Sequence, residues 1–405
     1  MWRAVGFRCP EIHHKGLNVG ATAAELATTD ASVHEFVMKI AARCNLNCTY
    51  CYEYSHGDET WRLAAKFMSP EVYTLATARI IEHATTHRLT DVFLGLHGGE
   101  PLLIGANRLE AMLSSLVEQF SKTDVRAHFS IQTNATLISE DIAKILSTYD
   151  VQVGISLDGD RPTNDKFRVD HRGKGSFDRV MRGIEILREH APQQLNGILS
   201  VIDVDSDPLE TFDTIAATGV ENCDFLLPHY NWDRPFPGVD QTKAIYGEWL
   251  SAIWGSWLGG RHSHMRIRFL DNIVARLIGH PGIYEQMTEN AAQLIVINTN
   301  GFIEGVDTLK STASGAQITD IHLSDNSIDE VLAHPVMTMR SDWNRSLPTG
   351  CQECQIKNIC TGGYLPHRYS TAREFDNPSI FCRDLKHIVH RIDTDLKETL
   401  QRKSA

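Results

Sequence analysis

Residues 36–54 read FVMKIAARCNLNCTYCYEY and decide how the rest of the sequence is interpreted. Phe36–Ala41 is an apolar run typical of a buried strand. It leads directly into three cysteines, Cys44, Cys48 and Cys51, spaced C-x3-C-x2-C. We therefore expect the cysteines on the loop that follows the C-terminal end of a strand, which is where α/β folds place their chemistry.

Three thiolates on one short loop suit an iron–sulfur cluster better than zinc. A structural zinc ion needs four closed ligands, whereas a 4Fe-4S cube can leave one iron for an external ligand. The alternatives are a zinc loop with a remote fourth ligand, or reduced thiols without a metal. The aromatic Tyr50, between the last two cysteines, favours the cluster.

This arrangement of three cysteines and one aromatic residue resembles the radical S-adenosylmethionine (SAM) enzymes. The resemblance implies that the amino and carboxylate groups of SAM chelate the open iron. It also implies reductive cleavage of SAM to a 5′-deoxyadenosyl radical, which abstracts a hydrogen atom from the substrate.

Length and composition restrict the class of protein. A chain of 405 residues with 42% hydrophobic content can bury one large core and a smaller module. Seven of nine cysteines fall in two tight groups, which indicates metal ligands in a reducing compartment. Neither a signal peptide nor an apolar run of about 18 residues is found, so we expect a cytoplasmic protein without membrane contact. The net charge of −12 argues against a nucleic-acid partner.

Strand and helix patterns alternate between the cysteine loop and residue 227. Alternation of this kind predicts a parallel sheet with right-handed crossovers, hence an α/β fold. Six such units match the TIM-like partial (β/α)6 barrel of the radical SAM enzymes. The expected strands are Phe36–Ala41, Asp91–His97, Ala127–Gln132, Val151–Leu157, Leu195–Val204 and Asn222–Leu227.

Polar residues at the C-terminal ends of these strands are candidates for SAM contacts. Gly98 and Gly99 allow a close backbone approach, and Glu100 can accept a hydrogen bond from an ammonium group. This GGEP sequence resembles the radical SAM motif that binds the amino group of SAM. The resemblance also implies that other polar residues at strand ends contact the ribose and carboxylate of SAM. The simpler interpretation is that these residues form turns and helix caps. The candidates are Gln132, Asn134, Ser156, Asp158 and Arg168.

A second group of cysteines lies near the C-terminus: Cys351, Cys354 and Cys360 as C-x2-C-x5-C, and Cys382 after a further 22 residues. Four thiolates can bind zinc or a complete 4Fe-4S cluster. Behind a radical SAM barrel the pattern resembles the SPASM module, which holds two auxiliary clusters. Two of the family's other ligand positions are Val306 and Tyr364 here. We therefore predict one auxiliary cluster, and two 4Fe-4S clusters in the chain.

These features predict four regions: an N-terminal extension (1–34), the barrel (35–234), bridging helices (235–300) and a SPASM-like auxiliary-cluster module (301–405).

Two further residues are catalytic candidates. In related peptide-modifying enzymes an Asp that follows the G-x4-C cysteine serves as general base, and Asp307 follows Val306 in this register. The structural alternative for Asp307 is a cap. Cys223 lies within the sixth expected strand, where a buried apolar role competes with hydrogen-atom donation to a substrate radical.

HGGEPLL, KFRVDHRGKGSFDRVMRGI, VDTLKS and GGYLPHRY together resemble the FxsB/GrrM-type radical SAM/SPASM maturases of ribosomally made peptides. The resemblance implies oxidative, cyclophane-type cross-linking of a precursor peptide, with a reductant such as flavodoxin or ferredoxin. One alternative is a redox-neutral epimerase, or a dehydrogenase, of a small-molecule natural product such as an aminocyclitol or sugar antibiotic, with Cys223 as hydrogen donor. Another is a non-catalytic metal-cluster scaffold.

Overall fold

The computed structural model describes residues 32–404 except 238, 239, 241, 283, 284, 289–293 and 342–346. All but the last three residues of the predicted N-terminal extension (1–34) lie outside the described residues, and so does Cys9.

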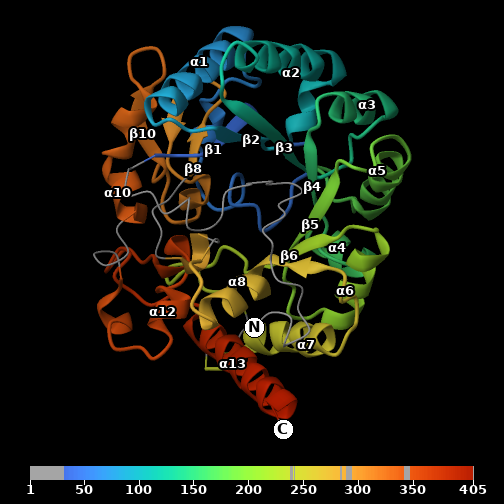
Figure 1. The fold of residues 1–405 in the computed structure, drawn as a ribbon, viewed down its shortest axis with the longest axis vertical. Coiled ribbons are helices and arrows are strands. Elements are labelled where there is room, and N and C mark those ends of the chain that lie inside the picture. The colour runs from blue at the N-terminus through green and yellow to red at the C-terminus, as the bar shows by residue number, and fades with distance from the viewer. Residues whose placement is uncertain are drawn as a thin grey trace.

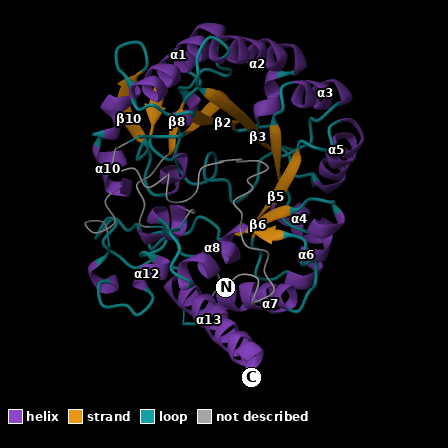
Figure 2. Cartoon of the chain, in the orientation of Figure 1, coloured by secondary structure: helices purple, strands orange, loops and turns teal. Residues whose placement is uncertain are grey.

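A curved ten-stranded sheet is the frame of the molecule (Figures 1 and 2). Its strand order is β10-β9-β8-β1-β2-β3-β4-β5-β6-β7, and neighbouring strands from β8 to β7 run parallel. This confirms the predicted α/β fold with a parallel sheet. The six strands that the first five crossovers join begin and end close to their expected bounds. They are β1 (Glu35–Ala41), β2 (Asp91–Gly98), β3 (Arg126–Thr133), β4 (Gln152–Ser156), β5 (Leu195–Val201) and β6 (Asn222–Leu226).

Helices cover the outer face of the curved sheet (Figure 1). Several start where the sequence supplies a cap: the hydroxyl of Ser69 accepts a hydrogen bond from Val72 N (3.4 Å), with Pro70 at the first helical position. A short helix over 161–167, which we did not predict, starts in the same way at Asp160 and Pro162. The helices of this layer are α1 (Pro70–Thr86), α2 (Ala106–Phe120), α3 (Glu140–Thr148), α4 (Arg161–Phe167), α5 (Phe177–His190), α6 (Pro208–Ala217) and α7 (Ile245–Leu258).

The region 235–300, predicted as bridging helices, also extends the sheet. It contributes α7 and α8 (Arg268–Leu277), but also β7 (Arg266–Ile267) beside β6 and β8 (Leu294–Ile297) beside β1. Runs of two and four residues are too short for periodicity to identify, and β8 is defined by pairing with a distant strand. Beyond β8 the sheet ends in two antiparallel strands, β9 (Phe302–Glu304) and β10 (Ile318–His322).

The C-terminal segment packs along the barrel. It contains α9 (Ile328–Leu332), α10 (Pro335–Ser341), α12 (Lys357–Cys360) and the long α13 (Cys382–Ser404). At the start of α13, Asp384 accepts hydrogen bonds from Tyr246 N (2.8 Å) and Gly247 N (3.0 Å) at the start of α7. Further along, Trp254 Nε1 donates to Asp395 Oδ2 (2.8 Å). These contacts fix α13 against α7, so the C-terminal segment is part of one packed body with the barrel.

Among the described residues, no helix combines the length and apolarity that crossing a bilayer requires.

Candidate functional site

The loop after β1 carries Cys44, Cys48 and Cys51 beside the C-terminal ends of the barrel strands. Leu46 N donates to Cys44 Sγ (3.3 Å), and Asn134 Nδ2 from the end of β3 lies 3.8 Å from the same sulfur. Burial, with the nearby Glu100 carboxylate adding to it, raises the pKa of Cys44 to about 12; burial also raises the pKa of Cys48 and Cys51. Buried thiols with raised pKa values keep their protons unless a metal cation replaces them.

The end of β2 presses against this cysteine loop. Gly99 N donates to Ala41 O (2.8 Å) and Glu100 N to Arg43 O (2.9 Å). A Cβ atom at Gly98 would lie 2.0 Å from Ala41 O, and one at Gly99 2.5 Å from Arg43 O. The two glycines are therefore required because the chain itself makes the close approach, and they hold the loop against the sheet.

Glu100 connects the cysteine loop to β3. The side chain is 1% exposed, and its carboxylate accepts from Leu102 N (3.0 Å), Thr133 Oγ1 (2.6 Å) and Asn134 N (2.8 Å). Burial raises the pKa of Glu100, whereas these hydrogen bonds act to lower it. With four acceptor positions and three donors, the carboxylate keeps one position for an external donor.

Gln132 and Ser156 lie side by side on the adjacent strands β3 and β4, where Gln132 Nε2 donates to Ser156 Oγ (3.0 Å). The space above Gly154 is taken by the Gln132 amide, because a Cβ atom there would lie 2.2 Å from Gln132 Oε1. Asn134 donates to Asn45 Oδ1 (2.9 Å) as well as approaching Cys44. Of these three predicted residues, Asn134 contacts the cysteine loop, and Gln132 and Ser156 bond to each other.

Tyr50, Asp158 and Arg168 form a buried chain beside the cysteines. The Tyr50 hydroxyl donates to Asp158 Oδ2 (2.6 Å) and accepts from Arg168 Nη1 (2.7 Å). The other Asp158 oxygen accepts from Val201 N (3.1 Å). Arg168 Nε is buried and has no hydrogen-bond partner among the described residues. An unpaired buried guanidinium nitrogen is costly, so this position suits an anionic ligand.

The residues at this edge fit an iron–sulfur cluster and a zwitterionic ligand. The three thiols form no disulfide. They interact electrostatically with one another, and Cys44 and Cys48 also with Arg168. An open carboxylate position on Glu100 suits an ammonium group, and Arg168 Nε suits a carboxylate.

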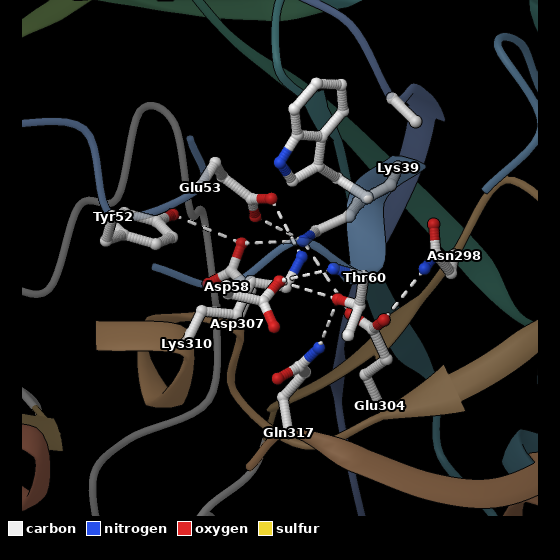
Figure 3. Close-up of polar contacts among 12 residues, drawn as sticks. Lys39, Tyr52, Glu53, Asp58, Thr60, Asn298, Glu304, Asp307, Lys310 and Gln317 are labelled. Carbon is white, nitrogen blue, oxygen red and sulfur yellow. Dashed lines mark hydrogen bonds and ion pairs between the residues drawn. The ribbon is translucent and has the colours of Figure 1, made fainter. Parts of the chain in front are cut away.

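A buried ion network lies next to the cysteine loop (Figure 3). Lys39, 2% exposed on β1, forms a close ion pair with Glu53 and lies 3.4 Å from Asp307 Oδ2 and 3.7 Å from Glu304 Oε2. Burial alone would lower the pKa of Lys39, but these carboxylates raise it well above its ordinary value. Glu53 is paired a second time, with Lys310 Nζ at 2.8 Å.

Asp307 contacts the residue that directly follows the last cysteine of the loop. Its Oδ2 accepts from the hydroxyl of Tyr52, the residue directly after Cys51, at 3.2 Å. Burial alone would raise the pKa of Asp307, but Lys39, His97 and Lys310 hold it well below its ordinary value. Asp307 is therefore ionised, although it is only 7% exposed.

Sequence reasoning missed the partners of Asp307. Lys39 interrupts the apolar run of the first strand, and a lysine in a buried strand requires carboxylate partners. That signal identifies Lys39 as unusual, but it does not identify Glu53 or Asp307 as the partners. The ion pair between Glu53 and Lys310 spans 257 residues, so no local spacing reveals it.

The four C-terminal cysteines line one pocket, as the prediction of a shared site requires. The other residues that line the pocket include two lysines. The full set of lining residues is Cys351, Cys354, Ile356, Lys357, Cys360, Gly362, Ser379, Cys382 and Lys386. Burial, with the neighbouring Cys382 adding to it, raises the pKa of Cys360 to about 12. Four thiols around one pocket, with lysines at its rim, fit a metal centre of net negative charge.

Two positions at which SPASM modules have ligand cysteines hold Val306 and Tyr364 in this chain. Val306 packs with Leu309 and Leu365 in a small apolar cluster. The hydroxyl of Tyr364 shares a hydrogen bond with Thr308 (2.5 Å). Neither position therefore supplies a thiolate, and each side chain makes a contact of its own.

Cys223 is not brought to these sites. It lies on β6 two residues before Phe225, so both side chains point to the same face of the sheet. Phe225 packs against Phe212 of α6 and Trp249 of α7, which places this face toward the outer helix layer. Burial raises the pKa of Cys223 well above its ordinary value, as expected for a thiol in the apolar core.

The sequence of the barrel matches a known family model. Residues 38–215 match the model of the radical SAM superfamily. This part of the chain is similar to radical SAM domains. Proteins with this domain use a 4Fe-4S cluster and SAM, which agrees with the three cysteines and the polar residues around them.

The chain is also similar, along most of its length, to anaerobic sulfatase-maturating enzymes. A cysteine-type anaerobic sulfatase-maturating enzyme from Clostridium novyi is 25% identical over 374 residues, covering 88% of this chain and 94% of the relative. The finer FxsB/GrrM-type resemblance stays a prediction.

Two solved proteins share the fold. Native anSMEcpe with bound AdoMet superimposes with a TM-score of 0.78 at 20% identity, over 91% of this chain and 99% of that one. The crystal structure of Streptococcus suis SuiB bound to precursor peptide SuiA gives 0.55 at 17% identity, over 83% and 72%.

Proposed function

We propose that this chain is a radical SAM enzyme that oxidises a side chain of a peptide substrate. The observation that carries the proposal is the position of Asp307: an ionised, buried carboxylate that is hydrogen-bonded to Tyr52, next to the last cysteine of the cluster loop. An oxidation that starts with hydrogen-atom abstraction must also release a proton, so it needs an acceptor near the cluster.

Two sets of cysteines would hold the cofactors. Cys44, Cys48 and Cys51 would hold a 4Fe-4S cluster with one open iron, and the C-terminal four would hold one auxiliary 4Fe-4S cluster. When bound, the first cluster and SAM supply a 5′-deoxyadenosyl radical, using an electron from a reductant such as flavodoxin or ferredoxin. The apolar contacts of Val306 and the hydrogen bond of Tyr364 support one auxiliary cluster rather than two.

Polar residues at the strand ends would orient SAM. Arg168 offers its unpartnered Nε to the carboxylate of SAM, and Glu100 offers its remaining acceptor position to the ammonium group. Gln132 and Ser156 would contact the ribose. Asn134 and Asp158 act mainly through the loop, because they bond to the segment that carries the cysteines.

Asp307 would accept the proton from the oxidised substrate. Its low pKa keeps it in the accepting form at every working pH, but also makes it a weak base. A weak base is sufficient here, because a carbon centre that loses an electron holds its adjacent protons weakly. Lys39 and Lys310 keep Asp307 ionised in a buried site, where an unpaired carboxyl group would be neutral.

For the product, we propose an oxidative cross-link in a precursor peptide, of the cyclophane type. Residue-level resemblance to peptide maturases supports this, and so does the shared fold with SuiB, which was solved with a precursor peptide. A second candidate substrate is a sulfatase, because the similarity to a sulfatase-maturating enzyme covers 88% of the chain. Epimerisation with Cys223 as donor has less support, since Cys223 faces the outer helices.

Mass spectrometry of the reaction tests the proposal. The reconstituted protein, a reductant and SAM should release 5′-deoxyadenosine, and a peptide encoded beside this gene should lose two hydrogen atoms with fragments that indicate a cross-link. A product of unchanged mass that takes up deuterium from solvent would support the epimerase instead. A protein with both cysteine sites filled that fails to cleave SAM would support a non-catalytic scaffold.

A further inference from the structure

A group of metal-ligand side chains lies apart from both cysteine sites, where α1 meets α9. His83 and His87 are four residues apart at the end of α1, so both imidazoles project from one side of the helix. Their ring centroids are 4.5 Å apart. Asp329 on α9 faces both rings. Figure 1 shows α1 at the edge of the molecule, well separated from α12, which carries part of the four-cysteine pocket.

The three side chains converge on a small volume. Asp329 Oδ1 lies 2.7 Å from His83 Nδ1 and 2.7 Å from His87 Nε2, and the three atoms all lie within 4.8 Å of one another. Tetrahedral zinc, with bonds of about 2.0–2.1 Å, holds neighbouring ligand atoms about 3.3 Å apart. Zinc therefore requires Asp329 Oδ1 to lie about 0.6 Å farther from each ring nitrogen, and the two ring nitrogens to lie about 3.3 Å apart.

The surroundings of His83 favour metal ligation. His83 is 1% exposed, and its Nε2 lies 3.2 Å from Val33 O. Val33 N also donates to His83 Nε2 (3.1 Å) in the tautomer that carries its proton on Nδ1; in the other tautomer Nε2–H donates to Val33 O and leaves Nδ1 free to bind a metal, which is the arrangement found for metal-bound histidines. The Asp329 side chain is 40% exposed, which leaves the site open to an ion and to water.

We propose that His83, His87 and Asp329 bind one zinc ion, with water as the fourth ligand. Two imidazole nitrogens and one carboxylate oxygen suit zinc, whereas calcium and magnesium prefer oxygen ligands alone. The ligands are separated by up to 246 residues, so the ion ties the first helix of the barrel to the C-terminal segment. The role is structural and does not depend on the proposed reaction.

Zinc analysis of the cluster-loaded protein tests this proposal. Anaerobic reconstitution with iron and sulfide first fills both cysteine sites, and chelating resin then removes loosely bound metal. Equilibrium dialysis against zinc should give about one zinc per chain, with a higher midpoint of thermal unfolding. His87→Gln and Asp329→Asn, both at partly exposed positions, should each weaken zinc binding at least tenfold and leave the iron content unchanged.

The matched control is His128→Gln. His128 Nε2 lies 2.8 Å from Asp91 Oδ1, and Arg126 also pairs with that carboxylate, so this histidine–aspartate pair lacks a second imidazole. The control should retain zinc at the wild-type affinity. Absence of zinc from the wild-type protein, or equal affinity in wild type, His87→Gln and Asp329→Asn, would overturn the site. Neither result would bear on SAM cleavage, because the iron content and 5′-deoxyadenosine release are measured separately.

Discussion

The two cysteine sites use the same ligand chemistry but differ in what surrounds the sulfurs. The three-cysteine loop lies among polar groups with unused bonding capacity, chiefly Arg168 Nε and one acceptor position on Glu100. The four-cysteine pocket is lined instead by apolar groups, a hydroxyl and the lysines Lys357 and Lys386. Under the proposed function, this difference means that the first site would share its metal with a ligand and the second would enclose it.

Single cysteine substitutions should have the largest effects, and they test whether the two cysteine sites differ in function. In Cys48→Ala, 5′-deoxyadenosine release should fall to the background rate, because two thiolates do not hold the cube that delivers the electron. Chromatography of the reduced reaction measures this release. Cys223→Ala is the control, since that thiol lies in the core near neither site, and it should retain release. Substantial release by Cys48→Ala would refute the open-cluster assignment.

Cys354→Ala gives the opposite pattern at the enclosed site. SAM cleavage should persist, while the fold of the C-terminal segment and the yield of product both decline. Undiminished product from this variant would show that the auxiliary cluster has no part in turnover.

Asp307→Asn should have the next largest effect. SAM binding and 5′-deoxyadenosine release should continue, while product falls about 10²-fold, the scale of a lost general base. Asp58→Asn is the control: Asp58 is equally buried nearby but bonds only to hydroxyl and backbone donors among the described residues. Full product yield from Asp307→Asn would make that carboxylate purely structural.

Lys39→Met should have a smaller, pH-dependent effect. Lys39 lowers the pKa of Asp307, so its removal lets burial raise that pKa. The product rate of the variant should then fall about tenfold between pH 8 and pH 6, as Asp307 becomes protonated, while the wild-type rate stays nearly level. Lys39→Arg retains the charge and should keep the wild-type profile. Parallel profiles for Lys39→Met and wild type would show that Lys39 does not control Asp307.

The ion pair between Lys39 and Asp307 also affects how the stability of the fold depends on pH. A carboxyl group with a lowered folded-state pKa stabilises the protein above its unfolded-state pKa of about 3.9. That contribution is lost only as the pH falls below this value, so the stability of the wild-type network should be insensitive to pH near neutrality.

The barrel could be predicted from sequence because its signals are local. Ser69 and Pro70 are a local signal for the start of α1, and apolar runs locate β1 to β6 within a few residues. The segment 161–167 carries an equally clear cap at Asp160, so this short helix also has a local sequence signal. The four C-terminal cysteines, which motif spacing assigns to one site, line one pocket.

Long-range features could not be predicted. β8 is a strand because it pairs with β1, and four apolar residues do not reveal that partner. Lys39 signals a buried charge, but its carboxylate partners come from distant segments that only folding brings together. The role of Gly98 and Gly99 likewise depended on the cysteine loop, which their backbone contacts directly.

Iron analysis of the anaerobically reconstituted protein tests the central claim, that one open and one enclosed cluster share this chain. Three cysteines and four cysteines, each holding a cube, predict about eight irons and eight sulfides per chain. Cys48→Ala and Cys354→Ala should each lower the count to about four. A wild-type value of about twelve would reveal a further cluster, and a value of about four would leave one cysteine site without iron; either result would contradict the account.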